Sequence, residues 1–281
     1  MTLRRFLRTA ATAAAVGSTT WAACWAWQQA DKLGMQDTPL LPGGKWHVHD
    51  GLRPQPPVVT PGTVSTPEGP GKAPSDAVVL FDGRDASAWR AQDGSPAGWK
   101  VQDGTLVVTS AKTPGGGPIF SKQAFGDCQI HLEFATPTPA KGKGQGRGNS
   151  GLIVMSRYEI QLLDCFENPT YPDGTTTAVY GQTPPLVNAC RPPGEWQTYD
   201  VAFTAPRFKD DGSVATPAYI TVFHNGVLTQ NHTASLGSVV WKKVAQYEKH
   251  ADKEPIMLQD HGDPVRFRNI WVRELKNVEQ P

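Results

Sequence analysis

The stretch RYEIQLLD, residues 157–164, has the pattern of a β-strand with one apolar and one polar face. Side chains alternate across a strand, so the apolar face would hold Tyr158, Ile160 and Leu162. Glu159 and Gln161 would share the other face, whereas strict alternation puts Asp164 on the apolar side. A β-bulge between Gln161 and Asp164 would return Asp164 to the face of Glu159. With that bulge, the strand would present two carboxylates on one face of a sheet.

Further strand patterns recur on both sides of this stretch, from residue 76 onward. They alternate between polar and apolar residues or run apolar, and turn signals such as QDGT (102–105) and HNGV (224–227) separate them. Only WKKVAQYEKH, residues 241–250, has a helical pattern. Many strands and few helices over about 200 residues predict an all-β protein, a jelly-roll β-sandwich of two antiparallel sheets.

The N-terminus has the pattern of an export signal. MTLRRFLR is basic and is followed by a small, weakly apolar segment, which predicts a Tat- or Sec-type signal over residues 1–30. Cys24 follows two alanines, as in a lipoprotein cleavage site, so a lipid tether through Cys24 is an alternative to a cleaved signal. The expected location is periplasmic, outer-membrane-anchored or extracellular. The Pro/Gly-rich residues 31–75 predict an extended linker before a domain at 76–277.

The net charge and the cysteine content indicate which binding partners and which cellular compartment to expect. The formal net charge of +1 favours neither nucleic acid nor an anionic membrane surface as a partner. An oxidising compartment permits disulfides. Of the four cysteines, Cys165 and Cys190 lie in loop-like sequence and are the expected pair, whereas Cys128 lies in a strand pattern typical of a buried thiol.

Several motifs, taken together, resemble one enzyme family. FDGRDASAW, GWKVQDGTLVV, RGNSGLIVMSRYEIQLLD and QDHGDPVRFRNIWVREL occur in that order and resemble the 3-keto-disaccharide hydrolase family over about residues 76–277. The resemblance implies a concanavalin A-like jelly roll of the glucanase type. It also implies cleavage of small carbohydrates, glycosides whose sugar carries a ketone at carbon 3. A sugar 3-dehydrogenase that makes this ketone is the implied upstream partner.

The carboxylates of RYEIQLLD would supply the chemistry. A ketone at carbon 3 acidifies the hydrogen on carbon 2, so one base can remove it and the group on carbon 1 can leave. We expect Glu159 or Asp164 to be this base and the other acid to position or protonate the substrate. Gln161 cannot titrate, which argues against ordinary retaining hydrolysis by paired carboxylates. His261 is the expected proton shuttle, because imidazole titrates near neutrality.

Other polar residues are candidate sugar ligands. The expected substrate-binding set is Asn149, Ser150, Gln161, Tyr180, Gln182, Gln259, Arg266 and Arg268. Alternation would put Arg266 and Arg268 on one strand face together with Ile270. No cofactor is certain from the sequence, and a divalent cation held by Asp260 and His261, joined by Glu159, is an open alternative. A non-catalytic, lectin-like domain of the same fold is the alternative function, since fold alone does not determine activity.

Overall fold

A computed structural model describes residues 34–275, and the predicted signal segment with Cys24 lies outside this range. The strands are β1 (Val78–Phe81), β2 (Trp89–Arg90), β3 (Lys100–Gln102), β4 (Thr105–Val107), β5 (Ile119–Phe125), β6 (Cys128–Ala135), β7 (Ser150–Val154), β8 (Tyr158–Leu162), β9 (Gln197–Thr204), β10 (Arg207–Phe208), β11 (Val214–Thr216), β12 (Tyr219–His224), β13 (Val227–Ala234), β14 (Glu254–Leu258) and β15 (Arg266–Glu274). Two short 3-10 turns, η1 (Gly144–Gly146) and η2 (Pro172–Gly174), complete the elements. The predicted all-β jelly-roll class is confirmed.

Residues 241–250 do not form the predicted helix. Lys242 has a φ of +57°, a left-handed backbone conformation that interrupts a right-handed helix, and the segment consists of turns and extended chain. Within the described range, 34–275, no helix is long and apolar enough to cross a membrane.

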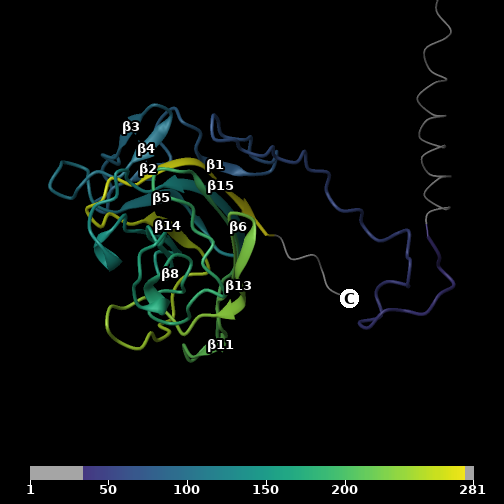
Figure 1. The fold of residues 1–281 in the computed structure, drawn as a ribbon. Helices are drawn as coiled ribbons and strands as arrows, with labels where there is room; N and C mark the ends of the chain where they lie inside the picture. The colour runs from purple at the N-terminus through teal and green to yellow at the C-terminus, as the bar shows by residue number, and fades with distance from the viewer. Residues whose placement is uncertain (1–33, 276–281) are drawn as a thin grey trace, which may run out of the picture. The chain divides into compact units, whose positions relative to one another are not determined.

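Two antiparallel sheets form the sandwich (Figure 1). One has eight strands in the order β13-β12-β9-β6-β15-β4-β3, with β1 also paired to β15. The other has five strands in the order β2-β5-β14-β7-β8. The core between them comes from alternate residues of each strand, such as Ile130, Leu132 and Phe134 on β6 and Tyr158, Ile160 and Leu162 on β8. The alternation predicted for β8 is therefore correct from Tyr158 to Leu162.

Strand β15 contains a bulge that the sequence pattern does not show. Its register against β6 shifts between Arg268 and Trp271, where Asn269 has a φ of +48°. The extra residue turns Ile270 into the core instead of leaving it on the face of Arg268. Trp271 turns outward and stacks on His131, with ring centroids 5.1 Å apart.

Residues 60–75, which we call the strap, lie against the outer face of β6 and β15. The strap is a hairpin closed by backbone hydrogen bonds such as Thr63 N–H to Lys72 O (3.0 Å). Arg268 Nη2 donates to the carbonyl of Thr66 at 2.7 Å, and the Ser65 hydroxyl donates to Glu133. The compact unit accordingly begins at Val59, within the range expected to be linker, and residues 34–58 belong to a separate unit.

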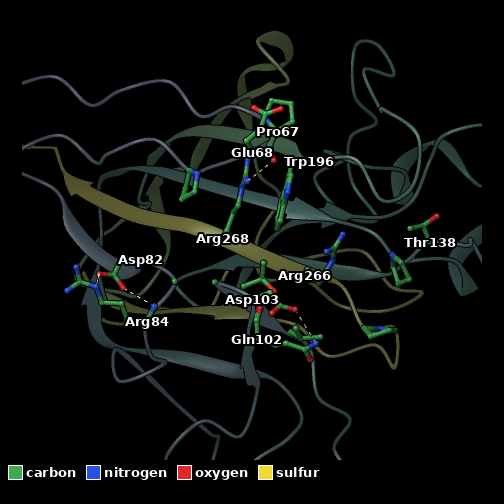
Figure 2. A pocket seen from close by; sticks show the side chains of 17 residues that line it. Pro67, Glu68, Asp82, Arg84, Gln102, Asp103, Thr138, Trp196, Arg266 and Arg268 are labelled. Carbon is green, nitrogen blue, oxygen red and sulfur yellow. Dashed lines mark hydrogen bonds and ion pairs between the residues drawn. The ribbon is translucent and has the colours of Figure 1, made fainter.

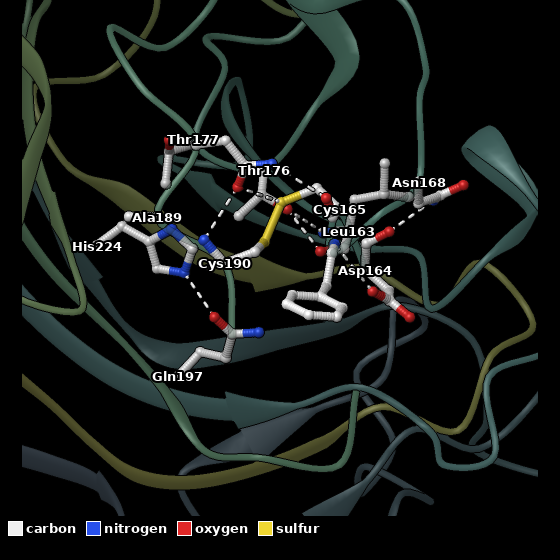
Figure 3. Close-up of a disulfide and its surroundings, with 12 residues drawn as sticks. Leu163, Asp164, Cys165, Asn168, Thr176, Thr177, Ala189, Cys190, Gln197 and His224 are labelled. Carbon is white, nitrogen blue, oxygen red and sulfur yellow. Dashed lines mark hydrogen bonds between the residues drawn. A yellow bond between two sulfur atoms is a disulfide. The ribbon is translucent and has the colours of Figure 1, made fainter. Parts of the chain in front are cut away.

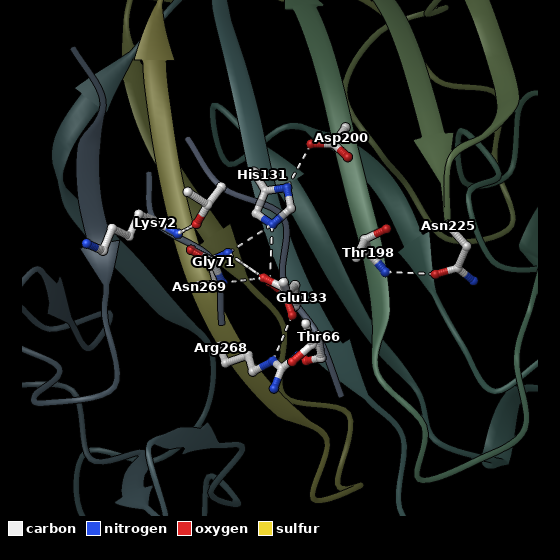
Figure 4. A network of polar contacts seen from close by, with 12 residues as sticks. Thr66, Gly71, Lys72, His131, Glu133, Thr198, Asp200, Asn225, Arg268 and Asn269 are labelled. Atoms are coloured by element: carbon white, nitrogen blue, oxygen red, sulfur yellow. Dashed lines mark hydrogen bonds and ion pairs between the residues drawn. The ribbon is translucent and has the colours of Figure 1, made fainter. Parts of the chain in front are cut away.

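A buried polar network anchors the strap (Figure 4). Glu133 is fully buried and accepts hydrogen bonds from Arg268 Nε at 2.7 Å and Asn269 Nδ2 at 2.8 Å. Burial alone would raise the pKa of Glu133, but hydrogen bonds from its neighbours, His131 first, outweigh burial and lower that pKa to about 2. His131 also contacts Asp200 at 2.7 Å. Each charge in this network has a partner, as a buried charge requires.

Candidate active site

A cavity of about 600 Å³ opens beside β7 and β8 of the five-stranded sheet. Its lining residues are Gln145, Asn149, Glu159, Gln161, Tyr171, Tyr180, Val239, Val240, Trp241, Gln259 and His261. The alternation of β8 explains the placement of two of them, because Tyr158 and Ile160 fill the core and Glu159 and Gln161 therefore face the cavity. Six residues of the predicted site thus meet in one place: Asn149, Glu159, Gln161, Tyr180, Gln259 and His261.

Glu159 is the carboxylate of this cavity. The residue is 5% exposed, and within residues 34–275 no hydrogen bond to its carboxyl group offsets this burial. Gly151 on β7 makes the room for it, since a Cβ at Gly151 would lie 2.8 Å from Glu159 Oε1. Burial raises the pKa of Glu159 to about 7. A carboxyl group with that pKa is about half ionised at pH 7, which suits a general base.

Two tyrosines stand beside this carboxylate. Tyr171 and Tyr180 come from the chain between β8 and β9, and their hydroxyl oxygens are 2.8 Å apart. The backbone N–H of Tyr180 donates to the carbonyl of Glu159 at 3.1 Å, which places the two residues next to each other. Burial and the hydrogen bond with Tyr171 raise the pKa of Tyr180 well above its ordinary value of 10. Tyr180 therefore keeps its proton at neutral pH and can donate it in a hydrogen bond.

Amide side chains form one wall of the cavity. Gln161 is fixed, because its Nε2 donates to Gln145 Oε1 at 3.1 Å and its Oε1 accepts from Leu162 N at 3.0 Å. Asn149 Oδ1 and Gln259 Oε1 are buried, and neither has a hydrogen-bond partner among the described residues. A buried oxygen without a partner costs about 1–3 kcal/mol. These two acceptors are therefore suited to hydroxyl groups of a ligand.

The structure does not bring Asp164 beside Glu159. The β7–β8 pairing runs without a register shift to Leu162, and β8 ends there. Arg147 Nε then donates to Asp164 Oδ2 at 2.7 Å, and Phe166 N donates to Asp164 Oδ1 at 3.2 Å. Because Arg147 and this turn hold the carboxylate, Asp164 does not line the cavity. The prediction that Asp164 joins Glu159 on one face is therefore wrong, and Glu159 faces the cavity without it.

Two other predicted ligands fasten the walls of the cavity. The Ser150 hydroxyl donates to the carbonyl of Gln259 at 2.7 Å, which ties β7 to the segment that carries Gln259. Gln182 Oε1 accepts from Leu236 N at 2.6 Å, and Gln182 Nε2 donates to the carbonyl of Gly237 at 3.3 Å. Neither Ser150 nor Gln182 lines the cavity, so the structure corrects their expected contact with substrate.

Arg266 and Arg268 lie in a different place. They belong to β15 of the eight-stranded sheet and line a separate cavity of about 720 Å³ (Figure 2). The guanidinium carbons lie 5.4 Å (Arg266) and 4.2 Å (Arg268) from the ring centroid of Trp196. Their polar strand face points away from the core, whereas the Glu159 cavity opens on the other sheet. Contrary to the prediction, Arg266 and Arg268 therefore do not share a cavity with Glu159.

The structure does not assemble the cation site expected at Asp260 and His261. Asp260 Oδ2 accepts from Ala111 N at 2.9 Å, and Asp260 Oδ1 accepts from Gly262 N at 2.8 Å. His261 lines the cavity with Glu159, but Asp260 does not. Within residues 34–275 no group of three or more His, Cys, Asp or Glu side chains is placed to hold a metal ion.

A disulfide joins Cys165 to Cys190, with Cα atoms 6.1 Å apart (Figure 3). The bridge ties together the two ends of the long connection between β8 and β9. That connection carries Tyr171 and Tyr180, so the covalent bond limits how far these two side chains can move from Glu159.

Sequence reasoning missed five lining residues: Gln145, Tyr171, Val239, Val240 and Trp241. Gln145 lies in a glycine-rich stretch that looks like a flexible loop, and Trp241 opens the segment with a helical pattern. All five lie outside the strands, where neither alternation nor spacing predicts a partner.

Comparison with known proteins places this site in a family. A family model described as a 3-keto-alpha-glucoside-1,2-lyase-like domain matches residues 76–273. Among curated proteins, none matches the chain. A solved structure of a candidate glycosyl hydrolase from Parabacteroides distasonis ATCC 8503 is 48% identical, with a TM-score of 0.75, and the match covers 85% of this chain and 100% of that one.

Two further structures from the same organism, also candidate glycosyl hydrolases, are similar in fold alone. They are 21% and 22% identical, with TM-scores of 0.52 and 0.51, and each match covers 71% of this chain and 94% or 99% of the other. The match of the family model over most of the domain, together with the 48% identical structure, shows the family. This chain belongs to the 3-keto-alpha-glucoside-1,2-lyase-like domain family.

Proposed function

We propose that this protein cleaves 3-keto-glucosides by eliminating the group on carbon 1 of the sugar. The observation that supports this function most directly is Glu159, a single buried carboxylate whose pKa is raised to about 7. Amide side chains suited to sugar hydroxyls line the same cavity, together with Tyr171 and Tyr180, whose hydroxyl oxygens are 2.8 Å apart. One base in a polar pocket is what proton abstraction next to a ketone requires.

The proposed reaction breaks two bonds and leaves one new double bond. The Glu159 carboxylate takes the proton from carbon 2, and the electron pair forms an enolate between carbons 2 and 3. Tyr180 donates a hydrogen bond to the enolate oxygen. The ketone then re-forms, a double bond forms between carbons 1 and 2, and the bond from carbon 1 to the leaving oxygen breaks. His261, at the edge of the cavity, supplies the proton that the leaving oxygen takes.

The single carboxylate favours elimination over ordinary glycoside hydrolysis. Retaining enzymes place two carboxyl groups about 5–5.5 Å apart, and inverting enzymes about 6.5–9.5 Å apart. Here Asp164 is bound by Arg147, and among residues 34–275 no second Asp or Glu lines the cavity. Addition of water to carbon 1 of the unsaturated product would complete a net hydrolysis in a separate step.

The proposed substrate and location have further consequences. A 3-keto-glucoside must come from an enzyme that oxidises the hydroxyl group on carbon 3, so a sugar 3-dehydrogenase is the proposed upstream partner. The Cys165–Cys190 disulfide supports export to an oxidising compartment.

The test uses a 3-keto-α-glucoside carrying deuterium on carbon 2. The wild-type protein should release the leaving group and an unsaturated 3-keto sugar, detected by NMR, with a primary isotope effect. Glu159→Gln should lose about 10²–10⁴-fold in kcat/KM, the range that general-base catalysis contributes. Glu195→Gln, which removes an exposed carboxylate outside the cavity, is the matched control and should keep full activity.

Two results would reject the proposal. One is full activity of Glu159→Gln, and the other is cleavage that leaves the deuterium on carbon 2. Sugar binding without any release of the leaving group would favour the non-catalytic, lectin-like function instead.

A further inference from the structure

The lining of the Glu159 cavity contains two unlike sets of side chains. Asn149, Gln161 and Gln259 supply amide groups, and we call this set the amide wall. Val239, Val240 and Trp241, from the chain between β13 and β14, supply side chains with almost no hydrogen-bonding atoms, and we call this set the apolar wall. Trp241 is 68% exposed, which is unusual for a large aromatic side chain and leaves much of its ring open to a ligand.

The loop that forms this apolar wall, residues 236–246, is fixed to the domain near its start. Gln182 bonds to the backbone of Leu236 and Gly237, and Val239 N donates to the carbonyl of Arg157 at 2.7 Å. Gly237 has a φ of +136°, and a Cβ there would lie 2.1 Å from the carbonyl carbon of Gln246, so the loop closes tightly on itself. The start of the loop that carries Trp241 is thus tied to the domain.

One side of the Trp241 ring already has a neighbour. The Lys242 ammonium lies over the ring, 4.2 Å from its centroid. A cation over an indole is a favourable contact and helps to hold the ring in one orientation. Because Trp241 is 68% exposed, much of its ring surface remains accessible to a flat group from the substrate.

We propose that Val239, Val240 and Trp241 form the subsite for the leaving group, and that the natural leaving group is an apolar ring, aryl or cycloalkyl, and not a second sugar. This inference rests on the proposed function. A second hexose would bring several hydroxyl groups to Val239, Val240 and Trp241, whose side chains offer only the indole N–H as a partner, and a polar group removed from water without a partner costs free energy. An apolar ring gains free energy from the same wall. The amide wall, in turn, suits the hydroxyl groups of the keto sugar.

The test compares two substrates that share the 3-keto-α-glucosyl group. One leaving group is cyclohexanol and the other is the glucose of 3-keto-trehalose. Trp241→Ala should lower kcat/KM for the cyclohexyl substrate about tenfold, which corresponds to about 1.4 kcal/mol, and should change the value for 3-keto-trehalose by less than about twofold. Val244→Ala is the matched control, because Val244 is 75% exposed in the same loop but does not line the cavity.

A binding measurement separates this inference from the proposed chemistry. By calorimetry, the wild-type protein should bind unoxidised cyclohexyl α-glucoside about tenfold more tightly than trehalose, and Trp241→Ala should remove the preference. If neither keto substrate is cleaved but this preference holds, the proposed reaction is rejected and the apolar subsite stands. Equal losses on both substrates in Trp241→Ala, or tighter binding of trehalose, would overturn the apolar subsite.

Discussion

Ionisation of Glu159 should reduce the stability of the folded protein, and Glu159→Gln should remove that cost. Burial raises the pKa of this carboxyl group from the ordinary value of 4.5 to about 7 in the folded state. Each tenfold change in an ionisation constant corresponds to about 1.4 kcal/mol, so the difference amounts to about 3 kcal/mol. The free energy of unfolding is therefore about 3 kcal/mol larger at low pH, where Glu159 is protonated, than at high pH, where Glu159 is ionised.

The sign follows from the order of the two pKa values. Below pH 4.5 the carboxyl group of Glu159 is protonated in the folded and in the unfolded state, so its ionisation does not reduce the free energy of unfolding. Between pH 4.5 and about 7 the Glu159 carboxyl group ionises in the unfolded chain but stays largely protonated in the folded protein. The free energy of unfolding therefore falls as pH rises through this range toward the folded-state pKa of about 7. Above that pH the loss is complete, at about 3 kcal/mol. Glu159→Gln has no ionisable group there and escapes this loss.

Urea unfolding at pH 4 and pH 8 measures this effect, if ΔG is extrapolated to water at each pH. From pH 4 to pH 8, the free energy of unfolding should fall by about 3 kcal/mol more for the wild-type protein than for Glu159→Gln. Glu195→Gln removes an exposed carboxylate and should follow the wild-type curve. Parallel curves for the wild-type protein and Glu159→Gln would refute the claim that burial raises the pKa of Glu159.

Other perturbations test the surroundings of this carboxylate. Gly151→Ala would put a Cβ 2.8 Å from Glu159 Oε1, so kcat/KM should fall about a hundredfold while the thermal midpoint changes little; unchanged activity would contradict the geometry. The kcat/KM of the wild-type enzyme should fall about tenfold for each pH unit below about 7, because the base must be ionised, and a flat profile from pH 5 to 8 would exclude Glu159 as that base. Replacing Cys165 and Cys190 together by Ser opens a loop with a sequence separation of 25 and should cost about 3 kcal/mol in urea unfolding, whereas a loss below about 1 kcal/mol would show that packing alone holds the loop.

The sequence predicts the parts of the site that depend on strand alternation. Glu159 and Gln161 face the cavity because Ile160 between them is a core residue, and this pattern is visible in one short stretch. The prediction for Asp164 depended on a bulge, and alternation does not show that β8 ends at Leu162 or that Arg147 takes the carboxylate.

Long-range contacts account for most of the remaining differences. One partner of Glu133 is Ser65, 68 residues earlier in a Pro-rich stretch, so composition predicts a linker where the structure has the strap. The turn of Ile270 into the core depends on the left-handed backbone of Asn269, which no side-chain pattern reports. Trp241 belongs to a loop that is closed at Gly237 and tied at its start to Gln182, and both contacts are long-range.

The position of β15 has a consequence for how the eight-stranded sheet forms. This strand lies in the interior of the sheet, where it pairs with β6, β4 and β1. Until β15 pairs, β6 is joined only to β9 and β4 only to β3 among the described strands, so the sheet consists of two separate groups of strands. Pairing between strands far apart in the sequence forms slowly, because a long loop must close first. The eight-stranded sheet therefore becomes continuous only at the step in which β15 pairs with both groups.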